Sequence, residues 1–234
     1  MCSRVKGKNI EIKILYEDNH LLVVEKPPNM LSQEDKTGDA DMLNLLKADI
    51  KKRYNKAGNV YLGLVHRLDR PVGGVMVFAK TSKSASRLSD QIRLREFGKK
   101  YLAIVHGSFK KAHGRLEDYL LKDSSTNTVR VVDSSDDRAL KAVLEYDVIG
   151  ESSHLSLVKI NLLTGRPHQI RVQFAHSGHP LYGDRKYGKE QNKDTEQIAL
   201  WAVEISCTHP TLRKEMTFTS NPPNIYPWNI FFPN

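Results

Sequence analysis

The first part of the chain alternates between hydrophobic and polar positions. Residues 10–16 and 20–25 both alternate, and the polar residues 17–19 separate them. Alternation with a period of two is typical of half-buried β-strands, so this stretch predicts a β-hairpin. Pro27 and Pro28 follow directly and end the second strand, because proline has no N–H group for the strand ladder.

Three later stretches place apolar residues three or four positions apart, which is the spacing of one helix face. They are residues 38–57 with Leu43, Leu46 and Ile50, residues 81–97 with Leu88 and Ile92, and residues 166–177 with Ile170 and Phe174. Thr81 or Ser82 can cap the second of these helices. We therefore predict three helices that pack on a sheet.

The rest of the regular structure is predicted to be strand. Strands are expected at residues 61–66, 75–80, 99–107, 154–163, 197–206 and 215–219, and within residues 114–150. The sum is an α+β fold with a largely antiparallel mixed β-sheet flanked by helices. No repeat and no long linker divides the chain, so we expect a basic leader over residues 1–9 and a single domain over residues 10–234.

The charge balance gives the first indication of a partner. The 234 residues carry a formal net charge of +9, and basic residues cluster at positions 51–53, 93–100, 110–111 and 185–186. An excess of this size favours a polyanionic partner, most often a nucleic acid. The chain has no arginine-rich tail, so the binding surface is expected on the folded body.

Several classes of protein are excluded. No run reaches the roughly 18 apolar residues that span a bilayer, and the charged start lacks the apolar core of a secretory signal. We therefore expect a soluble, cytoplasmic protein with no membrane partner. Cys2 and Cys207 are too few for a disulfide framework, and Cys207 with His209 supplies too few ligands for a zinc site. Glycine-rich nucleotide-binding loops are absent, so neither a metal nor a nucleotide cofactor is expected.

The strongest local feature is an aspartate at the mouth of a turn. Asp69 follows a strand-like run and precedes a turn made by residues 70–74, and Arg67 and Arg70 stand on either side of it. Nearby positive charge favours the carboxylate form, and a carboxylate can act as a nucleophile without a general base. The alternative is that Asp69 only pairs with an arginine and begins the turn.

Two further residues have both a functional and a structural interpretation. Arg166 is predicted at the first turn of a helix, where the helix dipole disfavours a cation. A carboxylate or phosphate partner would explain it, and so would a surface arginine that reaches solvent. Tyr101 lies in a predicted strand, where it is either half-buried core or an aromatic face on which a flipped base can stack.

Taken together, these segments resemble the RluA-type family of RNA pseudouridine synthases over most of the chain. Five segments carry the resemblance in the family's order: Val24–Pro27, His66–Asp69, Lys100–Gly107, Leu163–Arg171 and Gly183–Gly188. The resemblance implies the pseudouridine synthase fold for the single domain. It also implies an isomerase that converts specific uridines of ribosomal or transfer RNA to pseudouridine without a cofactor.

The resemblance also implies roles for individual residues. Asp69 is expected to be the catalytic nucleophile, Arg166 to pair with it, and Tyr101 to stack on the flipped uracil. Asp69 can attack the anomeric carbon or the uracil ring, or abstract a sugar proton, and the sequence leaves these routes open. Substrate-binding contacts are expected from His66, Arg67, His168, Ile170 and Arg171. For His66 and Arg67, simple packing is the alternative.

The chain departs from the family pattern in two places. Val72 and Gly73 stand where the family commonly has Thr-Ser before a glycine, which removes two hydroxyl groups. The leader is too short for the small RNA-binding domain of many relatives, so RNA recognition is expected to rest on the catalytic domain. We expect a monomer, and no sequence feature indicates otherwise.

A catalytically silent RNA-binding or RNA-folding protein on the same scaffold is the alternative function, and the altered turn is the only feature that favours it. A zinc-dependent nucleobase deaminase is excluded, because its His/Cys ligand set is absent.

Overall fold

The alternating residues at the start of the chain form the predicted hairpin. The structure is a computed structural model that describes residues 4–7, 10–192 and 197–232. Strand β2 (Ile10–Glu17) pairs antiparallel with β3 (Leu21–Lys26). Strand β1 (Arg4–Gly7) precedes them and pairs with β2, so part of the stretch expected as a basic leader forms a strand.

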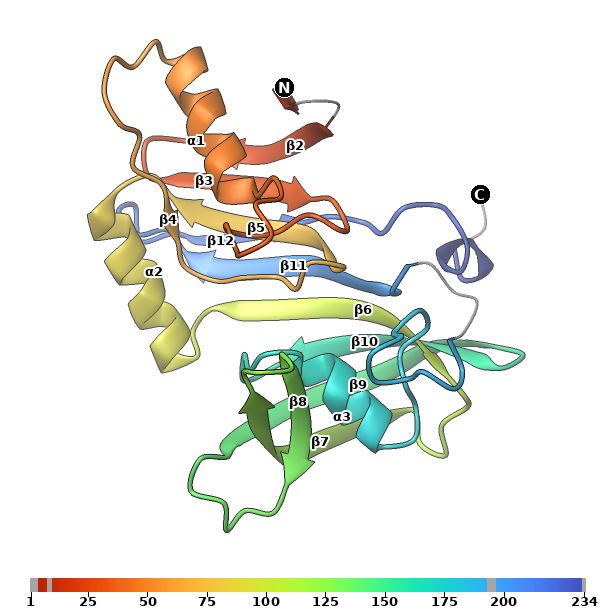
Figure 1. Cartoon of the computed structure of the whole chain (residues 1–234). Coiled ribbons are helices and arrows are strands. Elements are labelled where there is room, and N and C mark those ends of the chain that lie inside the picture. The colour runs from red at the N-terminus through yellow and green to blue at the C-terminus, as the bar shows by residue number, and fades with distance from the viewer. Residues whose placement is uncertain (1–3, 8–9, 193–196, 233–234) are drawn as a thin grey trace. The chain divides into compact units, whose positions relative to one another are not determined.

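The expected fold class is confirmed, with antiparallel strand ladders and three α-helices in the described part of the chain (Figure 1). Within this fold the chain makes two compact units. The first unit comprises residues 1–98 and 202–221, and the second comprises residues 99–201 and 222–234. The chain passes between the units three times, which explains why no linker marks a boundary in the sequence.

The first unit is built on a sheet with β3 and β5 (Gly73–Ala79) at its centre. Its strand order is β1–β2–β3–β5–β11, where β11 is Leu200–Thr208. The short β4 (Gly63–Leu64) pairs with β5, and β12 (Glu215–Thr219) pairs with β11. The strand expected at residues 61–66 is therefore wrong in length, since only two of its residues pair.

Two helices of the first unit begin directly after a polar residue that caps the first turn. Helix α1 (Met42–Arg53) begins after Asp41, whose side chain accepts a hydrogen bond from the Asn44 N–H group. Helix α2 (Ser82–Leu94) begins after Thr81, whose hydroxyl accepts from the Ser84 N–H group. Such caps satisfy N–H groups that have no partner within the helix. Helix α2 ends before the expected Phe97, because Arg95 adopts the left-handed conformation.

One apolar cluster of the first unit lies between α2 and the sheet. Leu88 of α2 is fully buried and belongs to one apolar cluster with Val75 and Val77 of β5. All seven residues of β5 are buried, so this strand is covered on both faces. A strand without an exposed face gives the turn at its start a fixed support.

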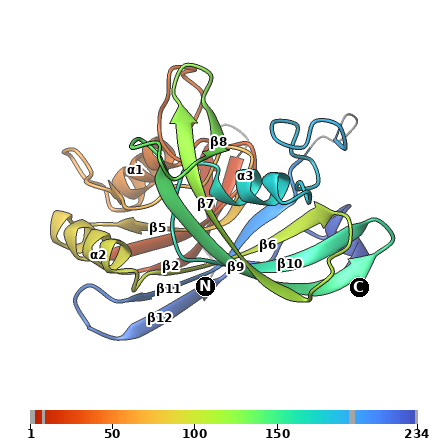
Figure 2. The ribbon, with the colours of Figure 1, turned by 90° about the horizontal axis from the view of Figure 1, so that it is seen from below.

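The second unit is a five-strand antiparallel ladder. Its order is β6 (Gly98–His106), β10 (Leu155–Leu162), β9 (Leu140–Ser152), β7 (His113–Asp123) and β8 (Thr128–Val132). Helix α3 (Gln169–His176) lies on one side of these strands, against β7 and β8 (Figure 2). A single 3₁₀ turn, η1 (Trp228–Ile230), follows near the C-terminus.

Helix α3 is shorter at its start than the sequence predicted. His168 has a left-handed backbone (φ 52°), so the helix cannot extend back to Arg166. The Arg166 N–H group instead donates to the side-chain Oε1 of Gln169 at 3.0 Å. Arg166 therefore lies in the loop before the helix, outside the first turn where the helix dipole would disfavour a cation. No helix of the described residues is long and apolar enough to cross a membrane.

Candidate active site

Asp69 lies in a turn between β4 and β5, and the backbone around it is held by side chains. The Asp69 carbonyl accepts a hydrogen bond from the Val72 N–H group at 3.0 Å. The buried Ser32 hydroxyl donates to the Leu68 carbonyl at 2.7 Å and accepts from the Leu68 N–H group at 3.2 Å. One hydroxyl thus satisfies both backbone groups of the residue before Asp69, which fixes the direction in which the carboxylate leaves the chain.

Lys26 holds the other side of the same turn. Its side chain has no exposed surface, and Nζ donates to three carbonyls. The acceptors are those of Pro27 at 3.0 Å, Met30 at 2.6 Å and Arg70 at 3.0 Å. Three acceptors match the three N–H bonds of an ammonium group. The residue after Asp69 is therefore tied directly to the end of β3.

The Lys26 ammonium also interacts electrostatically with the Asp69 carboxylate. Burial lowers the pKa of Lys26 to about 7. The negative charge of Asp69 acts in the opposite direction, and the positive charge of Arg70 adds to the lowering. Removal from water disfavours the charged form of lysine, and a nearby carboxylate restores part of the loss. Lys26 and Asp69 are thus electrostatically coupled within the first unit.

The residues beside Asp69 have different environments. His66 Nε2 accepts a hydrogen bond from the Val77 N–H group at 3.0 Å, and its ring lies 5.5 Å from that of Phe97. Arg67 is exposed. Arg70 pairs with Asp39 at 2.7 Å, and both of these side chains are about half exposed. The Arg70 guanidinium therefore has a carboxylate partner other than Asp69.

The altered turn after Asp69 keeps the glycine that its geometry needs. Gly74 has φ +120°, and a Cβ there would lie 2.3 Å from the Ala202 carbonyl oxygen. Val72, at the first of the two positions where hydroxyl groups are missing, is only 2% exposed. An apolar side chain suits this buried position, so the departure from the family pattern leaves the turn packed.

Tyr101 and Arg166 both belong to the second unit. Tyr101 stands on β6 opposite Ile160 of β10 and is 7% exposed. Arg166 is partly exposed, and its Nε donates to the Lys141 carbonyl at 3.0 Å. The predicted nucleophile belongs to the first unit, so the predicted catalytic residues are divided between the two units.

A buried amide network fixes the loop that carries Arg166. Gln169 Oε1 accepts from the Thr164 hydroxyl at 2.8 Å as well as from the Arg166 N–H group. Gln169 Nε2 donates to Gln173, which in turn donates to Asp118 of β7 at 2.7 Å. Buried polar groups need such partners. No local pattern in the sequence distinguishes these glutamines from exposed ones, so the sequence did not predict this network.

The predicted substrate-binding residues of α3 have structural partners. Arg171 is 7% exposed and forms a two-point ion pair with the buried Asp184, with Nε–Oδ2 and Nη2–Oδ1 distances of 2.8 Å. Its guanidinium also lies 5.2 Å from the centre of the Tyr187 ring. A buried bidentate pair of this kind supports structure. The substrate-binding role expected for Arg171 thus gains no support from its position.

His168 and Ile170 are placed by the same part of the second unit. His168 Nδ1 lies 2.6 Å from the Tyr187 hydroxyl, which also accepts a hydrogen bond from the Val129 N–H group at 3.0 Å. Ile170 is 5% exposed on α3. Tyr187 therefore connects the start of α3 to β8, and the expected substrate contacts of His168 and Ile170 stay predictions.

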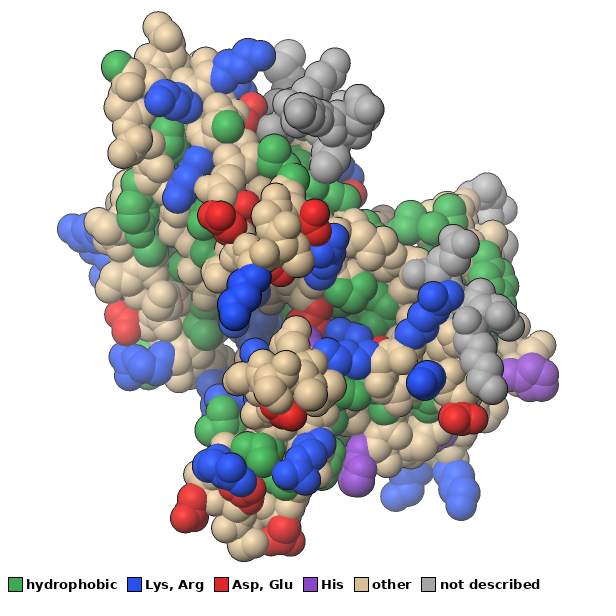
Figure 3. Space-filling model, viewed as in Figure 1, with side chains coloured by type: hydrophobic (Ala, Val, Ile, Leu, Met, Phe, Trp, Pro, Cys, Tyr) green, Lys and Arg blue, Asp and Glu red, His purple; other side chains and the backbone are tan. Residues whose placement is uncertain are grey.

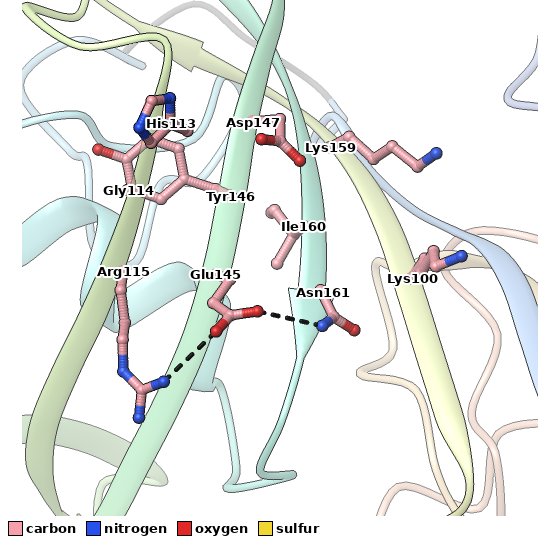
Figure 4. A pocket seen from close by; sticks show the side chains of 10 residues that line it. All are labelled: Lys100, His113, Gly114, Arg115, Glu145, Tyr146, Asp147, Lys159, Ile160 and Asn161. Carbon is pink, nitrogen blue, oxygen red and sulfur yellow. Dashed lines mark hydrogen bonds and ion pairs between the residues drawn. The ribbon is translucent and has the colours of Figure 1, made fainter.

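The second unit carries an open hollow of about 630 Å³ on its ladder. Lys100, Arg115, Glu145, Lys159 and Asn161 are among its lining residues (Figure 4). Glu145 bonds Arg115 at 3.3 Å and Asn161 at 3.4 Å, so much of its charge is neutralised internally. None of the predicted catalytic residues lines this hollow.

Basic side chains are spread over one face of the protein (Figure 3). On the face shown in Figure 3, lysine and arginine side chains occur in many places, with fewer acidic ones among them. This distribution fits a protein that meets an extended polyanion over a broad area. Among the described residues, no three His, Cys, Asp or Glu side chains gather as a metal site would require.

Comparison with known proteins agrees with this architecture. Residues 20–176 match the family model of RNA pseudouridylate synthase. The solved structure of human RNA pseudouridylate synthase domain containing 4 superposes with a TM-score of 0.73. It covers 90% of this chain and 88% of that chain at 24% identity, which supports the fold.

Bacterial relatives are more similar in sequence. An uncharacterized RNA pseudouridine synthase of Mycoplasma genitalium is 35% identical over 92% of this chain and 68% of its own length. The ribosomal large subunit pseudouridine synthase C of a Buchnera aphidicola strain is 33% identical over 88% of this chain and 66% of its own. The ribosomal large subunit pseudouridine synthase D of Zymomonas mobilis is 32% identical over 92% of this chain and 71% of its own length. This chain therefore belongs to the RluA-type RNA pseudouridine synthase family, and it is an isomerase that acts on RNA.

Proposed function

We propose that this protein isomerises one or a few uridines of large-subunit ribosomal RNA, with Asp69 as the catalytic nucleophile. The ribosomal target is supported by relatives named as large-subunit synthases C and D. Transfer RNA, the other target that the sequence suggested, is tested by the same experiment.

The observation that carries the role of Asp69 is the support of its turn. Ser32 holds the residue before it and Lys26 holds the residue after it, and both supporting side chains are buried. A reacting group gains rate when it is held in place before the substrate arrives. Two buried side chains that hold the backbone of one turn are more than a simple ion pair needs.

The chemistry requires little beyond a placed carboxylate. The bond between the uracil nitrogen and the ribose carbon breaks, the base turns, and a carbon–carbon bond forms in its place. The ring carbon gives up its hydrogen and the freed nitrogen takes one up, so no oxidant or reductant is consumed. Asp69 begins this sequence, whether it acts on the sugar or on the ring.

Tyr101 and Arg166 of the second unit are the further residues that we propose to act on the target uridine. Tyr101 stacks on the uracil that has left its helix, an event that costs a few kcal/mol of stacking energy. Arg166 offers a planar guanidinium for a charge-assisted bond to an anion, and the family resemblance makes the reacting carboxylate its expected partner. The fixed loop before α3 gives Arg166 a defined backbone position for this contact.

Asp69→Asn keeps the size of the side chain and removes its charge. We expect turnover to fall by more than about 10³-fold while RNA affinity changes less than about threefold, because covalent and acid–base steps lose their reacting group. Pseudouridine is mapped in ribosomal and transfer RNA from cells that lack the gene and from cells complemented with each variant.

Asp39→Asn is the matched control, since it removes another carboxylate from the same unit that pairs only at the surface with Arg70. Sites that return with the parent and with Asp39→Asn, but not with Asp69→Asn, identify the substrate and support the role of Asp69. Turnover within tenfold of the parent in Asp69→Asn would reject that role. A map unchanged by loss of the gene, with no turnover on RNA from that strain, would favour the silent RNA-binding alternative.

A further inference from the structure

The side-chain ammonium of Lys99 has no partner among the residues that the structure describes. It makes no hydrogen bond and no ion pair with any residue in the described part of the chain. Its side chain is nevertheless partly buried, and burial lowers its pKa with no opposing contribution from a carboxylate. Keeping a cation away from water without an anion costs free energy. A position of this kind is explained when an anion arrives from outside.

The surroundings of Lys99 connect it to both predicted catalytic residues of the second unit. Lys99 and Tyr101 are two positions apart on β6, so their side chains leave the same face of the strand, about 7 Å apart. The ammonium reaches the loop before α3, where a Cβ at Gly165 would lie 3.1 Å from Nζ. Gly165 leaves room for the ammonium, and Arg166 is the next residue.

The neighbouring Lys100 has the opposite orientation. Its side chain lines the open hollow together with Asn161, which stands opposite it on β10 (Figure 4). Alternation along the strand then puts Lys99 on the other face. The two lysines have the same chemistry and adjacent backbones, and only one of them shares a face with Tyr101.

We propose that Lys99 binds a backbone phosphate of the RNA beside the target uridine, on the face of β6 that carries Tyr101. This inference rests on the proposed function. The phosphates are the negatively charged groups of RNA, and lysine binds them as a flexible point charge. With a uracil against Tyr101, the phosphate of the same or the next nucleotide lies within reach of the four-carbon side chain. Lys99 thus fixes the backbone while Tyr101 contacts the base.

The first test compares Lys99→Met and Lys100→Met in stability and in RNA binding. Removing an unpaired, partly buried charge is expected to raise the Tm by about 2–4 °C. For a short fluorescein-labelled single-stranded RNA that contains one uridine, Lys99→Met is expected to weaken affinity about 5–10-fold. It should also reduce the slope of log affinity against log salt by about 0.7, the share of one phosphate. Lys100→Met should leave both the Tm and the slope near the parent values.

The second test identifies the phosphate. In an RNA substrate that carries the mapped uridine, the phosphates beside that uridine are replaced one at a time by neutral methylphosphonates. At one position, the parent should lose about as much affinity as Lys99→Met loses on unmodified RNA. Lys99→Met should lose no more than twofold there, because the contact is already missing. Lys99→Arg should recover most of the affinity.

The outcomes separate this inference from the proposed function. A lowered Tm with an unchanged salt slope in Lys99→Met would overturn the inference and give Lys99 a structural role. Equal losses for the parent and Lys99→Met at every methylphosphonate position would overturn it as well. If the parent forms no pseudouridine in any RNA, the proposed function fails, while the salt slopes on the labelled RNA still decide whether Lys99 binds phosphate.

Discussion

A lysine with no exposed surface supports the turn that carries Asp69. Lys26 donates to three carbonyls, one of them from Arg70, which lies 44 positions later in the chain. The contact joins the end of β3 to the residue after the predicted nucleophile. At the residue scale, the stability of the first unit and the placement of Asp69 therefore depend on the same side chain.

Lys26→Met tests this dependence. The variant leaves three buried carbonyls without their donor, so we expect the free energy of unfolding to fall by roughly 3 kcal/mol. Turnover should fall with it under conditions where the variant is still folded, because the Asp69 turn is released. Urea unfolding and turnover on the mapped RNA measure the two effects. Lys13→Met is the control, since Lys13 is half exposed and pairs with Glu25 at the surface, and its change should stay within about 0.5 kcal/mol.

The parent and Lys26→Met should differ in how the free energy of unfolding depends on pH. The folded pKa of Lys26 is about 7, and its ordinary value is 10.5. Between these values the unfolded chain holds a proton that the folded chain lacks, so the contribution of Lys26 to stability rises with pH across this window. Below pH 7 the contribution is constant. The difference in the free energy of unfolding between the parent and Lys26→Met should thus widen from pH 7 to pH 10. A difference that stays constant would contradict the lowered pKa.

At the scale of elements, α3 is fixed to the rest of the second unit through the loop at residues 183–188. Arg171 of the helix pairs with Asp184, and Asp184 Oδ1 also accepts from the Lys186 N–H group at 3.0 Å. Tyr187 of the same loop bonds His168 and the backbone of β8. The helix that follows Arg166 is therefore positioned by a buried polar network as well as by its apolar face.

Arg171→Met separates a structural role from the substrate-binding role first expected for this residue. Removing one partner leaves the Asp184 carboxylate buried and unpaired, so we expect a loss of about 3–5 kcal/mol in the free energy of unfolding. Affinity of the folded variant for RNA should stay within about twofold of the parent. Chemical denaturation and RNA titration give the two numbers. Arg115→Met, which removes an exposed ion pair with Glu145, is the control and should cost less than about 1 kcal/mol.

At the scale of the whole molecule, the net charge of +9 supplies the general attraction for RNA. Each phosphate contact made by a basic side chain releases counterions, so affinity for single-stranded RNA should fall by about 0.7 log units per log unit of salt for each contact. Titrations of the labelled RNA at several salt concentrations give the slope. A slope near zero would mean that the basic surface makes no phosphate contacts.

Local patterns in the sequence predicted the elements well. The hairpin at residues 10–25 and the cap at Thr81 depend on neighbours in the chain, and their chemistry is visible in a short window. The predicted start of the third helix was wrong. The left-handed backbone of His168 prevents the helix from extending back to Arg166, and the Gln169 side chain accepts the Arg166 N–H bond instead. Neither feature has a sequence signature strong enough to outweigh the apolar spacing.

The sequence alone determined the family, the antiparallel α+β class and the candidate residues Asp69, Tyr101 and Arg166. These follow from short motifs and from periodicity, which act over a few residues. Only the tertiary structure decided that Lys26 and Ser32 hold the turn of Asp69. It also decided that Arg171 forms a buried ion pair with Asp184, and that the Lys99 ammonium lacks a partner in the described part of the chain. The physical reason is that burial and hydrogen-bond partners depend on residues far apart in the chain, which become neighbours only when the strands pair.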